Sequence, residues 1–568
     1  MSRTEQPAEL SFEHHMSDAE ALMWNIEKDP WMNPSGATIA IVDRPINADE
    51  FRHRMRYAVS RIPRLRQRVS PSLGRMSPPS WVPDHEFDFD FHVRHLSLPK
   101  PGTLEQLHAL GARLLEDPFD RTRPLWLFVI IDGLHDGRGA LFMKIHHTIS
   151  DGKGMVQLAE LYMNPRRDAS LPPTVDLRAL IESEAAPLVE AEEKSGPDLS
   201  GSLTQAANSS LGHLIRRQVG MVRRVAGEVA LWSSDLTRVQ DATSGLVHEV
   251  KQAFDQLGGS SDDSTGSPIW KQRSRQRRLE ALRLPLSDVK SAGKALGGSI
   301  NDFFVTGAIT GALRYHEKRN VGVESLNASF VVSTRTDATS GSNAFTPVKV
   351  NFPGEAMSPS ERFATVSALI ARERSGVHGG GLIADLARVA NLLPTSTVTR
   401  FARAQAAKLD FATSNLPAAP FPMYIAGSLL LELVTLGPVA GTAFNLTAMS
   451  YNGSLDMGIH IDPAAVEDPA DLKRCLVEAY DELLMAAAAS GSSGTAAQAT
   501  APRTAKAAPP KSTARPVRPT RAKESTKAAP AKSLASTPSP KTARAAKATK
   551  AASSRRTPTA RPARKSAK

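Results

Sequence analysis

The sequence contains one cysteine, Cys475, among its 568 residues. A single cysteine cannot form a disulfide within the chain, so we expect a fold that needs none and a cytoplasmic location. No run of about 18 uninterrupted apolar residues is present, so we expect no membrane-spanning helix. The first ten residues carry Glu5 and Glu9 and have no apolar stretch, so we expect no secretory signal there.

Two common catalytic patterns are also missing. The chain has no G-x-S-x-G nucleophile elbow, and Cys475 has no histidine near it in the sequence, which disfavours a covalent acyl-enzyme. It has no H-E-x-x-H pattern, so we predict no metal site of that kind.

Basic residues are abundant but unevenly distributed. The net charge is +12, yet residues 491–568 hold 19 lysines and arginines and one acid, Glu524. Residues 1–490 therefore hold 51 basic and 57 acidic residues, so the body of the chain is acidic. Residues 487–568 are rich in Ala, Lys and Pro and have almost no large apolar side chains, so we expect a disordered basic tail.

The tail has three candidate roles. It could bind a membrane or lipid-droplet surface through its positive charge, which would make the protein peripherally associated with membranes or lipid inclusions. It could bind nucleic acid, which is less favoured because the tail has no aromatic residue for base stacking. It could equally be a solubilising segment without a partner.

The remaining sequence divides into three parts. Residues 1–165 alternate strand and helix patterns, residues 166–275 read as a connector, and residues 276–486 return to alternating patterns. The fold class is therefore α/β. The connector includes a basic amphipathic helix at 210–232, which could pack on its own domain or lie on a membrane. Ser17, Ser287 and Asn301 or its neighbour are the expected helix caps.

The segment His146-His147-Thr148-Ile149-Ser150-Asp151-Gly152 follows a strongly apolar strand predicted at 140–145. Successive strand residues point to opposite faces, so one histidine can face a cleft while the other faces the packing. An imidazole with a pKa of roughly 6.5 suits a general base at neutral pH. A bare histidine pair would more often be structural, but the whole H-H-x-x-x-D-G string is much rarer by chance.

This segment fits ester formation from a thioester. A thioester is already activated, so the base need only remove the proton of an attacking hydroxyl. The segment therefore predicts acyl transfer without a serine nucleophile.

Together these residues resemble the bacterial wax ester synthase/diacylglycerol acyltransferase family, which belongs to the coenzyme A-dependent acyltransferase superfamily with chloramphenicol acetyltransferase. The resemblance covers about residues 11–486, and its motifs keep their order. They are Ser17-Asp18-Ala19, Pro124-Leu125-Trp126, His146 to Gly152, Gly297 to Asp302, Ser414-Asn415-Leu416-Pro417 and Ser450-Tyr451-Asn452-Gly453.

The resemblance implies two chloramphenicol-acetyltransferase-like lobes with a central channel. It implies His147 as the base and His146 and Asp151 as its support, with Gly152 keeping the channel open. It also implies acyl-CoA as a substrate, with no cofactor, and a diacylglycerol or long-chain alcohol as the acceptor.

Three further residues have competing explanations. The resemblance places Asn301 and Asp302 near the active centre, whereas helix capping explains Asn301 equally well. It places Trp126 behind the catalytic loop, where core packing is the simpler role.

Two other functions compete with fatty acyl transfer. One is condensation-domain-like transfer from a carrier-bound donor or to another acceptor, although no carrier domain is evident in the sequence. The other is a lipid-surface or nucleic-acid-binding protein without catalysis, against which the intact His147 and Asp151 argue.

Overall fold

The computed structural model describes residues 12–71, 78–150, 152–195, 266–333, 345–376, 387, 390–391 and 394–498. All of them belong to one unit that ends at Ala501. The predicted amphipathic helix at 210–232, Asp151 and tail residues 499–568 lie outside the described residues.

The N-terminal lobe is built on a seven-stranded sheet with the order β4-β5-β6-β1-β13-β12-β7. β4 and β5 run parallel, and the other neighbouring strands run antiparallel. The strands are β1 (Ser35–Val42), β4 (Val93–Ser97), β5 (Trp126–Asp132), β6 (Gly139–His146), β7 (Met163–Asn164), β12 (Tyr424–Ile425) and β13 (Ser428–Leu436); β2 (Gln67–Ser70) and β3 (Ser80–Pro83) form a separate ribbon.

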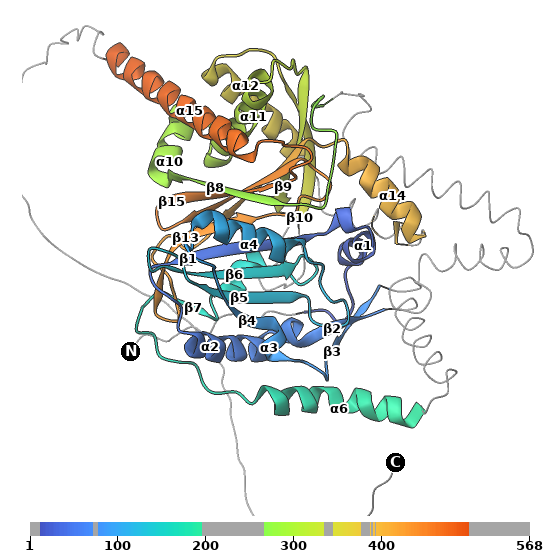
Figure 1. Cartoon of the computed structure of the whole chain (residues 1–568). Helices are drawn as coiled ribbons and strands as arrows, with labels where there is room; N and C mark the ends of the chain where they lie inside the picture. The colour runs from blue at the N-terminus through green and yellow to red at the C-terminus, as the bar shows by residue number, and fades with distance from the viewer. Residues whose placement is uncertain are drawn as a thin grey trace, which may run out of the picture. The chain divides into compact units, whose positions relative to one another are not determined.

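Helices cover both faces of this sheet (Figure 1). On one face α4 packs Leu107 and Leu115 against strand residues such as Phe142. On the other face α2 packs Phe51 against Phe128, whose rings stack at 6.5 Å. The helices of the lobe are α1 (Asp18–Ile26), α2 (Ala48–Arg61), α3 (Phe89–His92), α4 (Leu104–Glu116), α5 (Gly152–Ala159) and α6 (Leu177–Ser195), with 3-10 turns η1 (Pro30–Met32) and η2 (Pro63–Arg66).

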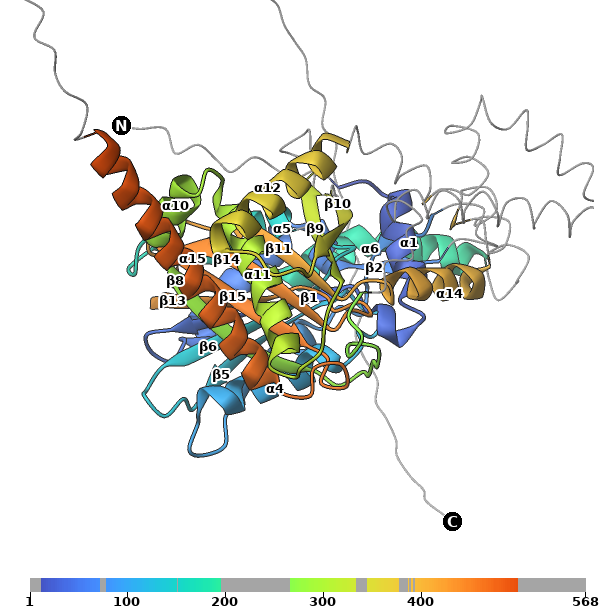
Figure 2. The ribbon, with the colours of Figure 1, turned by 90° about the horizontal axis from the view of Figure 1, so that it is seen from above.

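The C-terminal lobe is built on a six-stranded sheet with the order β10-β9-β11-β14-β15-β8. Figure 2 shows α11, α12 and α15 lying over its strands, and the core beneath them is a single apolar cluster. The strands are β8 (Arg278–Pro285), β9 (Ser325–Ser333), β10 (Phe345–Pro353), β11 (Phe411–Pro417), β14 (Phe444–Tyr451) and β15 (Ser454–Ile461); the helices are α10 (Leu286–Ala295), α11 (Ile300–Glu317), α12 (Pro359–Gly376), α14 (Thr395–Ala406) and α15 (Pro469–Gln498). None of the described helices combines the length and apolar composition needed to cross a membrane.

The C-terminal half of the sequence contributes two strands, β12 and β13, to the N-terminal sheet. β13 belongs to the C-terminal half of the sequence, but it pairs with β1, so that Ala37 lies opposite Leu436. β12 then extends the same sheet to β7. The N-terminal sheet is therefore completed only when residues beyond 420 have been added, although the two halves look separate along the sequence.

Most expected elements are confirmed, but two helix caps are wrong. Ser17 caps α1 in a capping box with Glu20, as predicted. Ser287 does not cap α10, because that helix begins after Pro285 without a side-chain cap. Asn301 does not cap α11 either: Ser299 occupies that position, and its hydroxyl accepts from the backbone N–H of Asp302. Both helices begin earlier than we predicted, which moves the caps upstream.

Candidate active site

The two histidines at the end of β6 occupy different environments. His146 lies opposite Ser35 on β1 and is fully buried. His147 follows the strand and is only partly buried. Its Nε2 atom lies 3.7 Å from the point where a Cβ atom would stand on Gly36. The expectation that one histidine faces the packing is therefore confirmed, and that histidine is His146.

Both ring nitrogens of His146 have partners. Nδ1 lies 2.7 Å from Oγ1 of Thr148 and also accepts a hydrogen bond from the backbone N–H of Thr148 at 3.1 Å. Nε2 lies 3.1 Å from Oε2 of Glu27 at the end of α1. The edges of Trp24 and Phe119 close the space around the ring. His146 is thus committed to structural contacts and has no access to a substrate.

Glu27 joins this histidine to a buried group of charges. Its carboxylate also lies 3.3 Å from Nη1 of Arg121, whose guanidinium stacks 3.3 Å from the centre of the Trp24 ring. Burial by itself would raise the pKa of Glu27. The hydrogen bond with His146 and the charges of Arg121 and Lys144 outweigh burial and lower that pKa. Glu27 is therefore a carboxylate at neutral pH.

Lys144 is buried two residues before His146 on the same face of β6. Its ammonium donates to the carbonyl oxygens of Leu114 and Asp117 at the end of α4, and it lies 4.5 Å from the centre of the Phe119 ring. Burial lowers the pKa of Lys144 to about 8. These contacts fix the end of α4 against the strand that carries the histidines.

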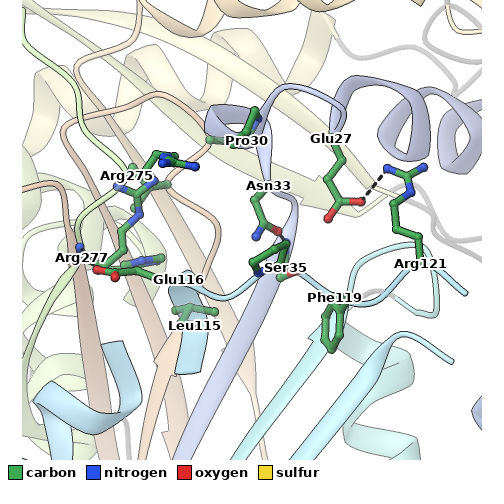
Figure 3. Close-up of a pocket in the computed structure, with 14 residues that line it drawn as sticks. Glu27, Pro30, Asn33, Ser35, Leu115, Glu116, Phe119, Arg121, Arg275 and Arg277 are labelled. Atoms are coloured by element: carbon green, nitrogen blue, oxygen red, sulfur yellow. Dashed lines mark hydrogen bonds and ion pairs between the residues drawn. The ribbon is translucent and has the colours of Figure 1, made fainter. Parts of the chain in front are cut away.

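A cavity of about 180 Å³ opens beside this cluster, lined by residues of both lobes (Figure 3). We call it the interlobe cavity. Figure 3 shows the guanidinium groups of Arg275 and Arg277 on one side and Glu27 with Arg121 on the other. Its lining includes Glu27, Asn33, Ser35, Glu116, Phe119, Arg121, Arg275, Arg277 and His460.

Two buried polar atoms on the cavity wall have no hydrogen-bond partner within the described chain, Oγ of Ser35 and Nε2 of His460. Nδ1 of His460 lies 2.8 Å from the carbonyl oxygen of Gly437. Burial lowers the pKa of His460 to about 3, so the ring is neutral at physiological pH. Because Nδ1 must then donate to that carbonyl, Nε2 of His460 is left as an acceptor.

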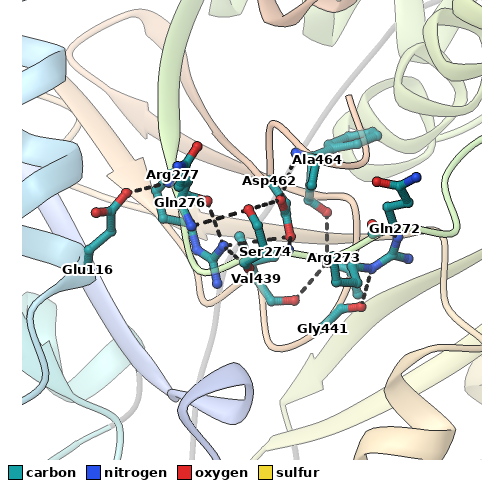
Figure 4. Close-up of polar contacts among 12 residues, drawn as sticks. Glu116, Gln272, Arg273, Ser274, Gln276, Arg277, Val439, Gly441, Asp462 and Ala464 are labelled. Atoms are coloured by element: carbon teal, nitrogen blue, oxygen red, sulfur yellow. Dashed lines mark hydrogen bonds and ion pairs between the residues drawn. The ribbon is translucent and has the colours of Figure 1, made fainter. Parts of the chain in front are cut away.

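A polar joint connects the lobes at the edge of the cavity (Figure 4). Glu116 at the end of α4 accepts a hydrogen bond from the backbone N–H of Arg277. Ser274 donates to Asp462 through both its backbone N–H and its hydroxyl, each at 2.6 Å. Arg273 donates to the carbonyl oxygen of Gly441 at 2.6 Å. The bond between Glu116 and Arg277 joins α4 to the residues just before β8, and the other bonds hold those residues against the loops at Gly441 and Asp462.

The remaining predicted site residues that the structure describes are Trp126, Asn301, Asp302 and Gly152. Trp126 is buried, donates to the carbonyl oxygen of Leu65 at 2.8 Å and stacks on His92, which is a core role. Asp302 accepts two hydrogen bonds from Ser299 at the start of α11, and neither it nor Asn301 lines the interlobe cavity. Gly152 begins α5, directly after the histidine loop.

Neither Glu27 nor Arg121 was predicted from the sequence as a residue of the site. Glu27 precedes His146 by 119 residues, and no recognised motif includes it. The one available signal was its place directly after the helix predicted to start at Ser17. In the described ranges, no group of three or more His, Cys, Asp or Glu residues is arranged to hold a metal ion.

Paired α/β lobes with two adjacent histidines at the end of an inner strand are the fold of the chloramphenicol-acetyltransferase-like class. The fold is similar to a wax ester synthase/diacylglycerol acyltransferase from Marinobacter aquaeolei VT8, with a TM-score of 0.55 and 18% identity, covering 84% of this chain and all of that one. It is also similar to a condensation domain of the calcium-dependent antibiotic synthetase, with a TM-score of 0.51 and 15% identity, covering 84% and 97% of the two chains.

The chain belongs to the wax ester synthase/diacylglycerol acyltransferase family. Residues 16–304 match the model of the family's catalytic domain, and residues 341–484 match that of its C-terminal domain. A Mycobacterium tuberculosis protein named as a candidate diacylglycerol O-acyltransferase is 28% identical over 471 residues, covering 83% of this chain and 91% of the relative. The protein is thus an acyltransferase, of a family in which the coenzyme A thioester is a substrate.

Proposed function

We propose that the chain transfers a fatty acyl group from acyl-CoA to the hydroxyl of diacylglycerol or of a long-chain alcohol, with His147 as the general base. The observation that carries the proposal is the difference in burial and contacts between the two histidines. His146 is fully buried and has partners on both nitrogens, whereas His147 is partly exposed and directs Nε2 towards a position without a side chain, Gly36.

The reaction is a direct transfer in two steps. Nε2 of His147 accepts the proton of the acceptor hydroxyl while the hydroxyl oxygen attacks the thioester carbon. The C–S bond then breaks, and the coenzyme A sulfur leaves as a thiol after taking that proton from His147. The products are an ester and free coenzyme A, and no acyl-enzyme forms.

The family relatives favour diacylglycerol as the acceptor, because several are named for that activity. A long-chain alcohol is the second candidate, since the family name covers both reactions. Condensation-like transfer to an amine is the competing reaction, because the fold is shared with a condensation domain.

The acceptor is tested by giving the full chain one donor, palmitoyl-CoA, with diolein, hexadecanol or hexadecylamine. We expect released thiol and labelled ester with diolein and, more slowly, with hexadecanol. Amide formation faster than either ester would replace the proposed function with the condensation-like reaction. Hydrolysis without transfer to any acceptor would reject acyl transfer to these classes.

A further inference from the structure

Glu27 contacts His146, whose ring in turn contacts the backbone directly after His147. We infer that Glu27 is a positioning residue, which selects the tautomer of His146 and thereby fixes the peptide that follows His147. This inference rests on the proposed function, in which His147 is the base.

The first step of the argument is the proton on the His146 ring. The backbone N–H of Thr148 can only donate, and it points to Nδ1 at 3.1 Å. Nδ1 must therefore present its lone pair, so the proton of a neutral ring is on Nε2. Nε2–H then donates to Oε2 of Glu27 at 3.1 Å.

The second step is the charge on the acceptor. Glu27 is ionised because the hydrogen bond with His146 and the charges of Arg121 and Lys144 lower its pKa, against the effect of burial. A carboxylate can only accept hydrogen bonds, so it stabilises the tautomer with the proton on Nε2 and opposes the other. Only 8% of its side chain is exposed, so water competes little for this bond.

The third step links the ring to the catalytic residue. The N–H that bonds to Nδ1 belongs to the peptide between His147 and Thr148. The ring of His146 therefore holds the backbone directly after the base, and Glu27 holds the ring. Without Glu27, Nε2–H is left buried without an acceptor, the ring is free to turn, and His147 loses its fixed approach to the reacting hydroxyl.

Arg121 completes the arrangement from the other side. It bonds to Glu27 and donates to the carbonyl oxygen of Trp24 at 2.9 Å, so the carboxylate stays at the end of α1. Ser17, in the N-terminal motif of the sequence, caps α1. The N-terminal motif and the histidine motif are thus joined through Glu27, which gives the short helix α1 a role in catalysis.

The test compares Glu27→Gln and Glu27→Leu with Glu182→Gln, an exposed control on α6. Glutamine keeps an oxygen that accepts from Nε2–H, whereas leucine does not. We expect kcat for palmitoyl-CoA and diolein to fall about 100-fold in Glu27→Leu and to recover to within about 10-fold of wild type in Glu27→Gln. KM for both substrates should stay within about twofold, because a residue that acts only through His146 does not change substrate binding.

A second readout does not depend on activity. The ¹⁵N shifts of histidine-labelled protein should show His146 with its proton on Nε2 in the wild type and in Glu27→Gln, and a mixture of tautomers in Glu27→Leu. A folded Glu27→Leu protein with unchanged kcat and unchanged shifts would overturn the inference. So would a change in KM alone, since that would make Glu27 a substrate-binding residue.

The two proposals fail in different ways. If His147→Ala keeps its turnover, the proposed function is wrong, whereas the shifts still report on Glu27. If His147→Ala is inactive and Glu27→Leu is as active as the wild type, His147 remains the proposed base and the positioning role of Glu27 is rejected.

Discussion

Gly36 on β1 and His147 at the end of β6 face each other so closely that the absence of a side chain on Gly36 shapes the site. A Cβ atom on Gly36 would lie 3.7 Å from Nε2 of His147 and 3.4 Å from the carbonyl oxygen of Leu436. Both distances are ordinary contacts, so the backbone tolerates a methyl group there. The space that this group would take is the space beside the proposed base.

Substitutions at Gly36 should therefore reduce turnover before they reduce stability. We predict that Gly36→Ala lowers kcat by about 10-fold and that Gly36→Val lowers it by at least about 100-fold, because each added carbon displaces the acceptor hydroxyl from Nε2. The melting temperature of Gly36→Ala should not fall, since alanine costs less conformational entropy in a strand than glycine. Steady-state kinetics and thermal unfolding measure the two effects. A Gly36→Val enzyme with normal kcat would show that acceptors approach from elsewhere.

Burial of Lys144 should be visible in the pH dependence of stability. Its pKa is about 8 in the folded protein, against an ordinary value of 10.5. Between these pH values the unfolded chain binds a proton that the folded chain does not, so the free energy of unfolding rises with pH across this window. Below about pH 8 both states bind the proton, and the cost of burying the charge is constant.

Lys144→Met should remove that dependence. We predict that its free energy of unfolding rises less steeply than that of the wild type between pH 8 and 10.5, by up to about 1.4 kcal/mol per pH unit. Urea unfolding at four pH values measures the difference, with the exposed Lys290→Met as the matched control. Parallel curves for the wild type and Lys144→Met would mean that Lys144 keeps its ordinary pKa.

Trp126 should matter for stability and not for chemistry. Its indole N–H donates to the carbonyl oxygen of Leu65, so Trp126→Phe leaves a buried acceptor without a donor. We predict a loss of about 1–3 kcal/mol in the free energy of unfolding, with kcat within about twofold of the wild type. Urea unfolding and steady-state kinetics on the same preparation measure both. A large loss of kcat at unchanged stability would instead make Trp126 part of the catalytic site.

The basic tail can be removed at a better-defined point than the sequence suggested. α15 continues to Gln498, so deletion of residues 499–568 spares the helix and still removes all 19 basic residues of the tail. We predict unchanged activity on detergent-dispersed substrate and weaker binding to anionic vesicles, because each basic residue near such a surface contributes about 1 kcal/mol. Vesicle sedimentation at two salt concentrations measures this, with a tail of equal length and no charge as the control. Equal binding with and without the tail would exclude the membrane role.

Local patterns predicted the local structure well. The apolar run at 140–145 correctly predicted β6, because a strand pattern of this kind depends only on neighbouring residues. The alternation of side chains along a strand was enough to predict that one of the two histidines is buried. The six motifs pointed to the family that the comparisons then confirmed.

Relationships across the chain could not be predicted in this way. β13 joins the N-terminal sheet because β1 offers it a free edge, and no periodicity in residues 428–436 reports which edge is available. Glu27 looked like one more charge after a helix, and only the fold brings it to His146. The caps at Ser287 and Asn301 were misplaced because both residues lie inside their helices, which begin directly after Pro285 and Ser299.

The most direct test of the account is the turnover of His147→Ala with palmitoyl-CoA and diolein, measured on folded full-length protein beside the wild type. The account predicts a loss of kcat by about 100-fold or more, as removal of a general base requires. An equally folded His147→Ala protein that makes triacylglycerol at the wild-type rate would contradict it.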